Sequence, residues 1–304
     1  MIILDNQDQF HIPFDTAVTI GKFDGLHRGH QLLIEKAQDC RKKGLKACFF
    51  TFDFSDFFDT VRPSILTFEE TVRFIEQHYE IDYLIRMPVT KAFFSLSYRT
   101  FLQENLLDHL HMKRIICGDD FCFGHNRMGT PDVLKELSKE LGYSVDIVPR
   151  IHYRDDVISS TRIRKDLTEG KIEDANACLG YLYSIEGDVV HGKKLGSRFG
   201  FPTANIVPQP EKYLPCFGVY AVKVRIDGKV YPGLANIGVK PTVTDEKKAV
   251  LEVHLFDQKL DLYGKKMTVE FLSFIRPEQK FGSEKELIAQ IAKDAVCVKR
   301  KLCF

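Results

Sequence analysis

Residues 17–43 read AVTIGKFDGLHRGHQLLIEKAQDCRKK, and this stretch decides the fold of the first half of the chain. Its apolar opening, residues 17–20, is typical of a short buried strand. The glycine-rich turn GKFDGLHRGH follows at 21–30, and the apolar spacing then predicts a helix over 31–43 that ends at Gly44. A glycine-rich turn between a strand and a helix N-terminus suits a nucleotide phosphate.

The alternation of strand and helix continues through the first 180 residues. Strand-like runs lie at 46–52, 83–86, 114–117 and 144–148, and helix-like segments at 69–78, 98–110 and 131–141. Repeated strand-then-helix order predicts a mainly parallel sheet covered by helices. Ligands of such sheets bind beyond the carboxyl ends of the strands.

From residue 181 the pattern changes to strands. Strand-like runs bounded by Gly, Pro and Asp lie at 183–190, 218–226, 230–237, 250–256 and 267–275, and a closing helix is expected over 284–300. Asp227-Gly228 is a strong hairpin turn. We therefore expect an α/β protein with a Rossmann-like parallel sheet in a domain of residues 1–180. A small antiparallel β-barrel with a C-terminal helix follows in a domain of residues 181–304.

Composition limits the partners of the chain. Its 304 residues include 44% hydrophobic and 28% charged residues, and the formal net charge is +1. A near-neutral protein has no general field for nucleic acid or for an anionic membrane. No apolar run reaches the roughly 20 residues that span a bilayer, and residues 1–6 do not read as a signal peptide. The eight cysteines form no C-x-x-C pair, which favours free thiols in a cytoplasmic protein.

The turn at 21–30 carries the groups for a first site. Gly21 and Gly25 permit a tight turn and close approach of a phosphate. His27 and His30 are three residues apart and share a face of the first helical turn, where two imidazoles can hydrogen-bond an α-phosphate and a leaving oxygen. Gly29 leaves room for the nucleotide. With no obvious nucleophile in the segment, we expect direct in-line attack by a substrate oxygen on phosphorus. The alternative is a helix start with two solvated histidines.

Two further segments could belong to this first site. ISSTRIR at 158–164 supplies helix-capping hydroxyls, Ser160 and Thr161, and a cation, Arg164, which together could hold a departing pyrophosphate. The alternative is a plain capped helix. GDDFCFG at 118–124 follows a predicted strand, and its residues Phe121 and Phe123 could line a flat ring or serve the core.

A second site is expected at 192–205, GKKLGSRFGFPTAN. Its glycines and cations suit a phosphate-cradling loop, and Thr203 and Asn205 offer the hard oxygen ligands that Mg²⁺ prefers. The alternative is a basic hairpin loop followed by an ordinary turn. Transfer of a phosphoryl group to an alcohol also needs a proton acceptor. Glu252, which shares a strand face with His254, is the candidate, although a Glu on an exposed face is an alternative.

These strings, in this order, resemble bacterial bifunctional riboflavin kinase/FMN adenylyltransferases. GKFDGLHRGH, GDDFCFG and ISSTRIR are similar to the adenylyltransferase module, whose fold is a Rossmann-like sheet. The resemblance implies that the catalytic His27 and His30 contact ATP phosphates. The residues that it assigns to ATP and pyrophosphate are Gly21, Phe23, Asp24, Gly25, Gly29, Ser160, Thr161 and Arg164, and those that it assigns to the flavin are Asp120, Phe121 and Phe123. Many members have Asn at the position of Asp120, and an ionised carboxylate does not donate the hydrogen bonds of an amide.

The second half resembles the riboflavin kinase module of the same family through GKKLGSRFGFPTAN, GLANIGVKPT (233–242), LEVHLFD (251–257) and DLYGK (261–265). The likeness implies that Thr203 and Asn205 bind Mg²⁺-ATP and that Glu252 is the base for the riboflavin 5′-hydroxyl. The other residues assigned to the kinase nucleotide are Gly192, Lys194, Gly196, Gly200 and Pro202.

We expect a bifunctional enzyme whose small-molecule partners are ATP, riboflavin, FMN and FAD, with the flavins as substrates and products. Protein partners are left undefined by the sequence. Two alternatives remain: an enzyme with one active module, and a non-catalytic regulator that binds flavin or RNA, although the near-zero net charge disfavours RNA.

Overall fold

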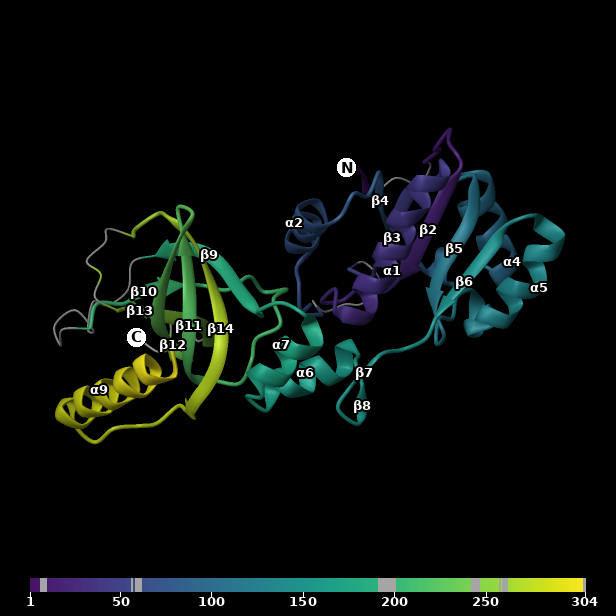
Figure 1. Ribbon diagram of the computed structural model, residues 1–304. Coiled ribbons are helices and arrows are strands. Elements are labelled where there is room, and N and C mark those ends of the chain that lie inside the picture. The colour runs from purple at the N-terminus through teal and green to yellow at the C-terminus, as the bar shows by residue number, and fades with distance from the viewer. Residues whose placement is uncertain are drawn as a thin grey trace. The chain divides into compact units, whose positions relative to one another are not determined.

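The structure is a computed structural model, and it describes residues 1–5, 10–55, 57, 62–190, 201–241, 247–256, 258 and 262–302. The side chains of residues 240, 241, 247 and 248 are outside this description. The chain forms two compact units, Met1–Ser160 and Thr161–Phe304 (Figure 1). Each unit is built around its own sheet.

A six-stranded parallel sheet forms the centre of the first unit, which confirms the expected parallel sheet. Its strands are β1 (Ile2–Asp5), β2 (Thr16–Gly21), β3 (Lys46–Asp53), β4 (Tyr83–Pro88), β5 (Met112–Gly118) and β6 (Ser144–Val148), in the spatial order β1-β4-β3-β2-β5-β6. Every neighbouring pair is parallel. The strand order reverses between β2 and β5, and such a reversal leaves a crevice at the carboxyl ends of these two strands.

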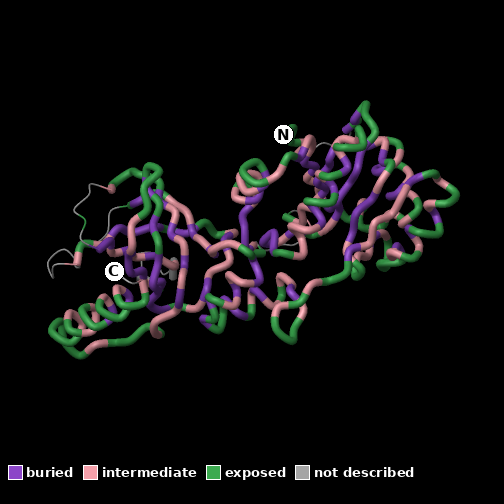
Figure 2. The backbone as a smooth tube through the Cα atoms, viewed as in Figure 1, coloured by how far each residue is buried: buried purple, intermediate pink, exposed green. Residues whose placement is uncertain are grey.

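Helical segments follow the strands. They are α1 (Arg28–Asp39), η1 (Cys40–Lys43), α2 (Phe68–His78), α3 (Lys91–Phe94), α4 (Tyr98–Thr100), η2 (Phe101–Asp108), η3 (His125–Arg127) and α5 (Pro131–Leu141). Of these, α1, α2, η2 and α5 bury apolar side chains. A short hairpin, β7 (His152–Tyr153) with β8 (Asp156–Val157), follows the sheet. Strand β2 is buried over almost its whole length and β3 over its middle residues (Figure 2), because a parallel sheet is covered on both faces.

The core follows the alternation of side chains along each strand. On β2, Val18 and Ile20 pack in a cluster that includes Leu106 of η2 and Leu134 of α5. The intervening side chains point to the other face, and α1 contacts β2, β3 and β5.

One expected helix differs in its winding. The sequence predicts a single helix over 98–110, whereas residues Phe101–Asp108 form a π-helix after the short α4. The backbone N–H of His109 accordingly donates to the carbonyl of Glu104, five residues earlier. The wider turn places residues four and five apart on one face, so that Phe101, Asn105 and Leu106 are all buried.

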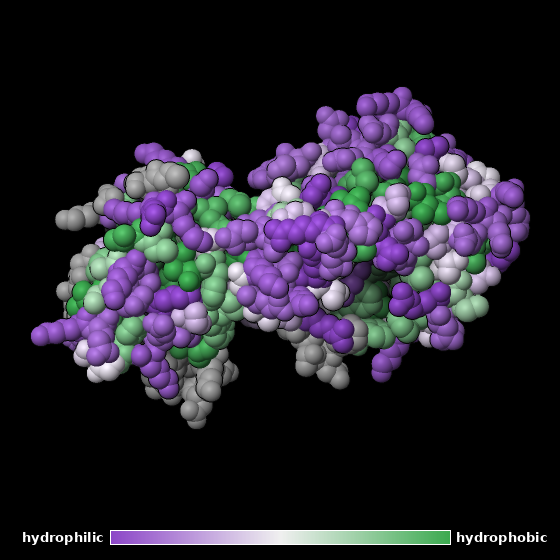
Figure 3. Space-filling view, turned by 60° about the horizontal axis from the view of Figure 1, so that its bottom comes forward, coloured by the Kyte–Doolittle hydropathy of each residue, from purple (hydrophilic) through white to green (hydrophobic). Residues whose placement is uncertain are grey.

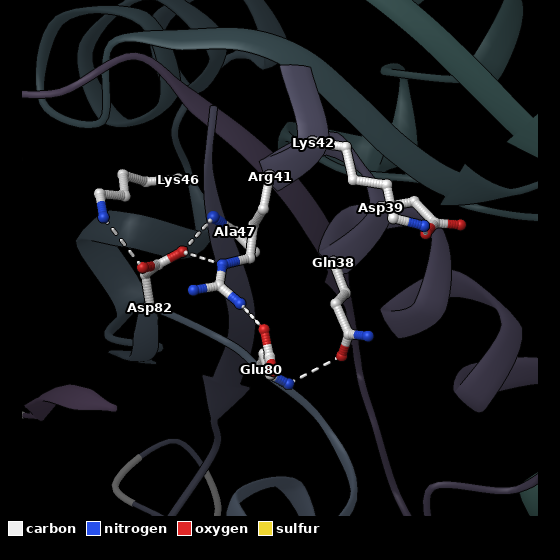
Figure 4. Close-up of polar contacts among 8 residues, drawn as sticks. All are labelled: Gln38, Asp39, Arg41, Lys42, Lys46, Ala47, Glu80 and Asp82. Atoms are coloured by element: carbon white, nitrogen blue, oxygen red, sulfur yellow. Dashed lines mark hydrogen bonds and ion pairs between the residues drawn. The ribbon is translucent and has the colours of Figure 1, made fainter. Parts of the chain in front are cut away.

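A polar cluster fixes the amino-terminal edge of the sheet, opposite to the strand ends that carry the motifs (Figure 4). The carboxylate of Asp82, which directly precedes β4, accepts the backbone N–H of Ala47 at 2.9 Å and faces Lys46 Nζ and Arg41 Nε, each at 3.2 Å. Arg41 also pairs with Glu80. These contacts join η1 to the starts of β3 and β4, so the end of the helix that follows the glycine-rich turn is held in place.

The second unit is a closed antiparallel barrel, which confirms the expected barrel with its C-terminal helix. Its strands are β9 (Ser184–Val190), β10 (Ala204–Ile206), β11 (Gly218–Ile226), β12 (Lys229–Pro241), β13 (Lys247–Leu255) and β14 (Lys266–Pro277), in the closed order β10-β13-β12-β11-β14-β9. Asp227 and Gly228 both have positive φ, 49° and 75°, as a type I′ hairpin turn requires. The expected hairpin is therefore confirmed.

Helix α9 (Glu284–Lys301) covers part of the barrel exterior. Its Val298 packs with Val219, Ala221 and Leu234 of β11 and β12. Strand β14 is bulged at Leu272 and at Ile275, which pair with no residue of β11. Both residues pack against the α9 cluster, because a bulge turns an extra side chain toward one face.

Two helices precede the barrel, α6 (Ser160–Thr168) and α7 (Ile172–Leu179). Asn176 joins α7 to the barrel: its Nδ2 donates to the carbonyl of Phe271 at 2.9 Å, and its Oδ1 accepts the N–H of Tyr183 at 2.7 Å. Helix α7 was absent from the sequence-based prediction, and its Ile172, Cys178 and Leu179 are fully buried.

No helix among the described residues is long and apolar enough to cross a bilayer. The face in Figure 3 is covered mainly by hydrophilic residues, with smaller apolar areas between them. The seven described cysteines are all free thiols, as expected from their spacing.

Candidate active sites

The glycine-rich turn lies at the point where the strand order reverses. Strand β2 ends at Gly21 and its neighbour β5 ends at Gly118. The turns GKFDGLHRGH and GDDFCFG therefore leave the same edge of the sheet from adjacent strands. This edge is where ligands bind in open parallel sheets.

His27 and His30 are stacked at the start of α1. His27 is the N-cap residue, and its Nδ1 accepts the backbone N–H of His30 at 3.4 Å. The two rings lie 3.6 Å apart between centroids, with 18° between their planes. Because Nδ1 of His27 accepts a hydrogen bond, a neutral ring carries its proton on Nε2. The cap thus leaves Nε2–H available as a donor.

Burial keeps both histidines neutral. It lowers the pKa of His27 to about 4, and burial together with the neighbouring His27 lowers the pKa of His30 well below its ordinary value. Nδ1 of His30 is a buried atom with no hydrogen-bond partner among the described residues. An unpaired buried polar atom is costly, so this nitrogen is suited to a ligand.

Two glycines of the turn lie close to neighbouring side chains, where a larger residue would have little space. Gly25 has φ +82°, and a Cβ there would lie 3.0 Å from Ile65. A Cβ on Gly29 would lie 3.2 Å from Cε1 of His27. The space beside Gly29 is therefore filled by the ring of His27, whereas the sequence led us to expect the nucleotide there.

Phe23 and Asp24 serve the shape of the turn. Phe23 is buried, with its ring 4.3 Å from that of Phe49 and 5.1 Å from that of His30. Oδ1 of Asp24 accepts the N–H of Ile65 at 2.8 Å. The structure thus places Phe23 behind the histidines as support.

The ISSTRIR segment begins α6. The hydroxyl of Ser160 donates to the backbone carbonyl of Asp24 at 2.8 Å, across 136 residues of chain, and so brings the start of α6 to the glycine-rich turn. Thr161 is exposed on the first turn. Arg164 lies one turn later in the second unit, with its guanidinium 4.6 Å over the ring of Tyr213.

The flavin candidates lie after β5. The rings of Phe121 and Phe123 are stacked 5.4 Å apart, with 16° between planes. Phe123 is buried in the core, whereas Phe121 is half-buried. Asp120 is exposed and folds back over Gly118, where its Oδ1 lies 3.0 Å from the position of a Cβ.

The barrel brings the kinase candidates together through strand register. Asn205 on β10 is directly opposite Glu252 on β13, which is in turn opposite Asn236 on β12. Directly opposed residues point to the same face of a sheet, while Leu251 and Val253 point to the buried face. Asn205 is buried and Glu252 is half-buried.

The segment before β10 is held by His254. Its Nδ1 lies 2.9 Å from the carbonyl of Pro202, and its ring makes an edge contact with Phe201 at 5.4 Å. Thr203 lies between Pro202 and β10, so this contact restrains the backbone directly before Thr203. Gly192, Lys194, Gly196 and Gly200 lie outside the described residues.

The donors around β10 suit a hard divalent cation. A hydroxyl from Thr203 and an amide oxygen from Asn205 are neutral oxygen ligands, and Mg²⁺ takes few protein ligands when phosphates and water complete its shell. The described residues contain no group of three or more His, Cys, Asp or Glu side chains that could hold a metal ion.

Sequence reasoning missed two residues of this region. Asn236 lies in register with Glu252, and His254 positions Pro202. The alternation of the strand had placed His254 beside Glu252, but its partner could be found only from the pairing of β10 with β13. Strand β10 itself was missed because it has three residues, too few for a periodic signal.

Comparison with known proteins gives a matching family for each half of the chain. A family model for FAD synthetase matches residues 10–162, and one for riboflavin kinase matches residues 179–302. A bifunctional riboflavin kinase/FMN adenylyltransferase of Buchnera aphidicola (subsp. Acyrthosiphon pisum) is 37% identical over 94% of this chain and 93% of its own length. The protein of that name from Escherichia coli K12 is 38% identical over 91% and 90%.

A solved structure matches both parts of the fold. The crystal structure of a protein described as a macrolide-efflux protein, from Streptococcus pneumoniae, has a TM-score of 0.87 and 31% identity over 98% of this chain and 99% of that one. Together with the curated relatives, these matches show that the chain belongs to the family of bifunctional riboflavin kinases/FMN adenylyltransferases.

Proposed function

We propose that the two reactions of this enzyme take place at two separate centres, one in each half of the chain. The enzyme phosphorylates riboflavin to FMN and adenylylates FMN to FAD. The observation that carries the assignment is the presence of two unlike polar centres: a stacked histidine pair at a helix N-terminus and an Asn–Glu pair on adjacent barrel strands.

For the kinase, we assign Glu252 as the base. The carboxylate accepts the proton of the riboflavin 5′-hydroxyl while that oxygen bonds to the γ-phosphorus of ATP and the bond to the ADP oxygen breaks. Its register with the buried Asn205 supports this role, because both side chains then lie on one face.

The family requires ATP and a divalent metal ion, which we propose is Mg²⁺ bound through Thr203 and Asn205. Bound there, Mg²⁺ would neutralise charge on the ATP phosphates. His254 holds the backbone at Pro202 and so orients both ligands. The nucleotide contacts of Gly192, Lys194, Gly196 and Gly200 stay predictions.

For the adenylyltransferase, we assign His27 and His30 as hydrogen-bond donors to ATP phosphate. An oxygen of the FMN phosphate bonds to the α-phosphorus, and the bond to pyrophosphate breaks. Neutral imidazoles suit donation, and the depressed pKa values of both rings support this state. The arriving phosphate would raise these pKa values, which strengthens the hydrogen bonds as negative charge develops.

The remaining predicted residues surround this centre. Gly21 and Gly25 allow close approach at the turn, and Gly29 leaves space for the His27 ring. Phe23 and Asp24 support the shape of the turn. We propose that Ser160, Thr161 and Arg164 receive the pyrophosphate.

Phe121 and Phe123 are proposed to face the flavin ring, and Asp120 is proposed to lie beside it. We also propose that both reactions occur in the cytoplasm, which suits the free thiols of the chain.

Separate substitutions test separate centres. We expect Glu252→Gln to abolish FMN formation from riboflavin and to leave FAD synthesis from supplied FMN intact. His30→Ala should do the reverse. Glu186→Gln on β9 and His78→Ala on α2 serve as matched controls with both activities retained. Products are separated chromatographically after incubation with ATP and Mg²⁺. Loss of both activities in a folded Glu252→Gln variant would contradict separate centres.

A further inference from the structure

The histidine pair by itself does not offset the charge of the reacting phosphates. Adenylylation brings the phosphate of FMN, an anion, against the negatively charged α-phosphate of ATP. Burial keeps His27 and His30 uncharged, so the two rings can donate hydrogen bonds but contribute no positive charge. A cation beside the phosphates would lower the repulsion between them, most strongly where water is excluded.

Lys22 brings a positive charge to the same turn. It directly follows Gly21, the last residue of β2, and it is exposed. The backbone N–H of Asp24 donates to the carbonyl of Lys22 at 2.9 Å, so the chain turns tightly at Phe23. The buried ring of Phe23 lies 5.1 Å from that of His30 between centroids, whereas the neighbouring Lys22 stays at the surface. The lysine thus directly precedes the residue that supports the histidine pair.

The ammonium group of Lys22 lies over the ring of Phe54. Its Nζ is 5.4 Å from the ring centroid, within the range of a cation–π contact. Phe54 directly follows β3, which is the parallel neighbour of β2 (Figure 1). The side chain therefore reaches across the carboxyl ends of two adjacent strands, at the edge where ligands of such sheets bind. Among the described residues Lys22 takes part in no ion pair, and an ammonium with three N–H donors suits a phosphate.

A row of phenylalanine rings connects this position to the proposed flavin residues. Neighbouring centroids in the row are 5.4, 5.7, 6.3 and 6.4 Å apart, in the order Phe121, Phe123, Phe101, Phe52 and Phe54. Two of these rings, Phe101 and Phe123, are buried in the core of the first unit, so the row is held in place. It begins after β5, on one side of the histidine pair, and ends under Lys22 after β3, on the other.

We propose that the ammonium group of Lys22 binds a phosphate group in the adenylylation reaction and is a further catalytic residue of that centre. The same chemistry has two sources, the attacking phosphate of FMN and the phosphates of ATP, which kinetics distinguish. The positive charge lowers the repulsion as an oxygen of the FMN phosphate bonds to the α-phosphorus and the bond to pyrophosphate breaks. Contact with Phe54 restricts the long side chain and so reduces the entropy lost on binding. This inference rests on the proposed role of His27 and His30.

Substitutions at Lys22 test the charge separately from the shape. Lys22→Met keeps an apolar stem without the charge, and we expect kcat/KM for FAD synthesis from FMN and ATP to fall about tenfold to a hundredfold. The melting temperature and the riboflavin kinase activity should stay unchanged, because the site is exposed and lies in the first unit. Lys22→Arg retains the charge and should recover most of the loss. A raised KM for FMN identifies the FMN phosphate as the partner, and a raised KM for ATP identifies ATP. A fall in kcat alone identifies a contact made in the transition state.

Lys36→Met is the matched control, because it removes the same charge from an exposed position later in α1. It should retain both activities. An unchanged kcat/KM in a folded Lys22→Met variant would overturn the proposal. An equal loss in Lys36→Met would point to the overall charge of the protein and would overturn it too. So would an equal loss in Lys22→Arg, or a loss that accompanies a lower melting temperature.

His30→Ala separates the inference from its premise. If His30→Ala abolishes FAD synthesis while Lys22→Met leaves it unchanged, the inference on Lys22 alone fails and the histidine centre stands. If His30→Ala retains FAD synthesis, the proposed centre fails and the role of Lys22 in it fails as well.

Discussion

His27 meets two demands at once. As the N-cap of α1 it accepts a backbone N–H through Nδ1, and as a buried ring it is kept neutral. The hydrogen bond to Nδ1 and the neutral state of the ring together fix the tautomer of His27, so that Nε2 carries the proton and can donate it. Gly29 leaves the ring its space, since a Cβ there would lie only 3.2 Å from it. The motif thus supplies both the hydrogen-bond donor, His27, and the small residue that leaves space for its ring, Gly29.

The depressed pKa gives a first prediction. We expect the ring protons of His27, followed by NMR in the free enzyme, to titrate with a midpoint of about 4 instead of 6.5. A midpoint near the ordinary value would show that the ring is solvated and would contradict the stacked arrangement.

The same shift fixes the sign of the pH dependence of stability. Between pH 6.5 and about 4 the unfolded chain binds a proton on His27 that the folded protein does not. The free energy of unfolding of the first unit therefore falls as pH drops through this window, by about 3 kcal/mol at most, and His27 makes its full contribution above it. In the His27→Gln variant, the free energy of unfolding measured with urea should no longer show this part of the pH dependence. His78→Gln, at an exposed site, should retain it.

At the scale of elements, the buried strand β2 carries two threonines that differ in their hydrogen bonding. Thr16 and Thr19 are both fully buried. The hydroxyl of Thr16 donates to the carbonyl of Leu110 at 2.8 Å, whereas Oγ1 of Thr19 has no hydrogen-bond partner among the described residues. Two residues of one type, three positions apart, therefore have opposite effects on stability.

Valine substitutions at these positions should change stability in opposite directions. Thr19→Val removes an unpaired hydroxyl at nearly constant shape, and we expect it to raise the free energy of unfolding by about 1 kcal/mol. Thr16→Val leaves a buried carbonyl without its donor and should lower that free energy by about 1–2 kcal/mol. Thermal unfolding of the two variants checks this, and destabilisation by Thr19→Val would refute the reading.

At the scale of the whole molecule, the two proposed centres are built on different folds, a parallel sheet and a closed barrel. Both are proposed to use ATP. The phosphate turn depends on a parallel sheet whose strand order reverses at β2 and β5, while the Asn205–Glu252 pair depends on closure of the barrel by β10. Helices α6 and α7 belong with the barrel by their contacts. Whether the functional boundary lies near residue 180 stays a prediction.

Removal of divalent metal gives a prediction at this scale. We expect EDTA to abolish both FMN and FAD formation and to leave the melting temperature unchanged, because Thr203 and Asn205 supply only neutral ligands and the ion enters with ATP. Circular dichroism with parallel product assays checks both parts. A clear drop in melting temperature would show that the metal stabilises the fold, contrary to this assignment.

Local patterns in the sequence determined the parallel sheet, the barrel, the Asp227-Gly228 hairpin and the motifs of both sites. Periodicity of apolar residues records which face of an element is buried, and glycines record where the backbone turns tightly. The tertiary structure decided which residues meet: His27 with His30 in a stack, Asn205 with Glu252 in register, and Ser160 with Asp24 across 136 residues. Such contacts depend on strand register and packing between distant segments, which no local pattern specifies.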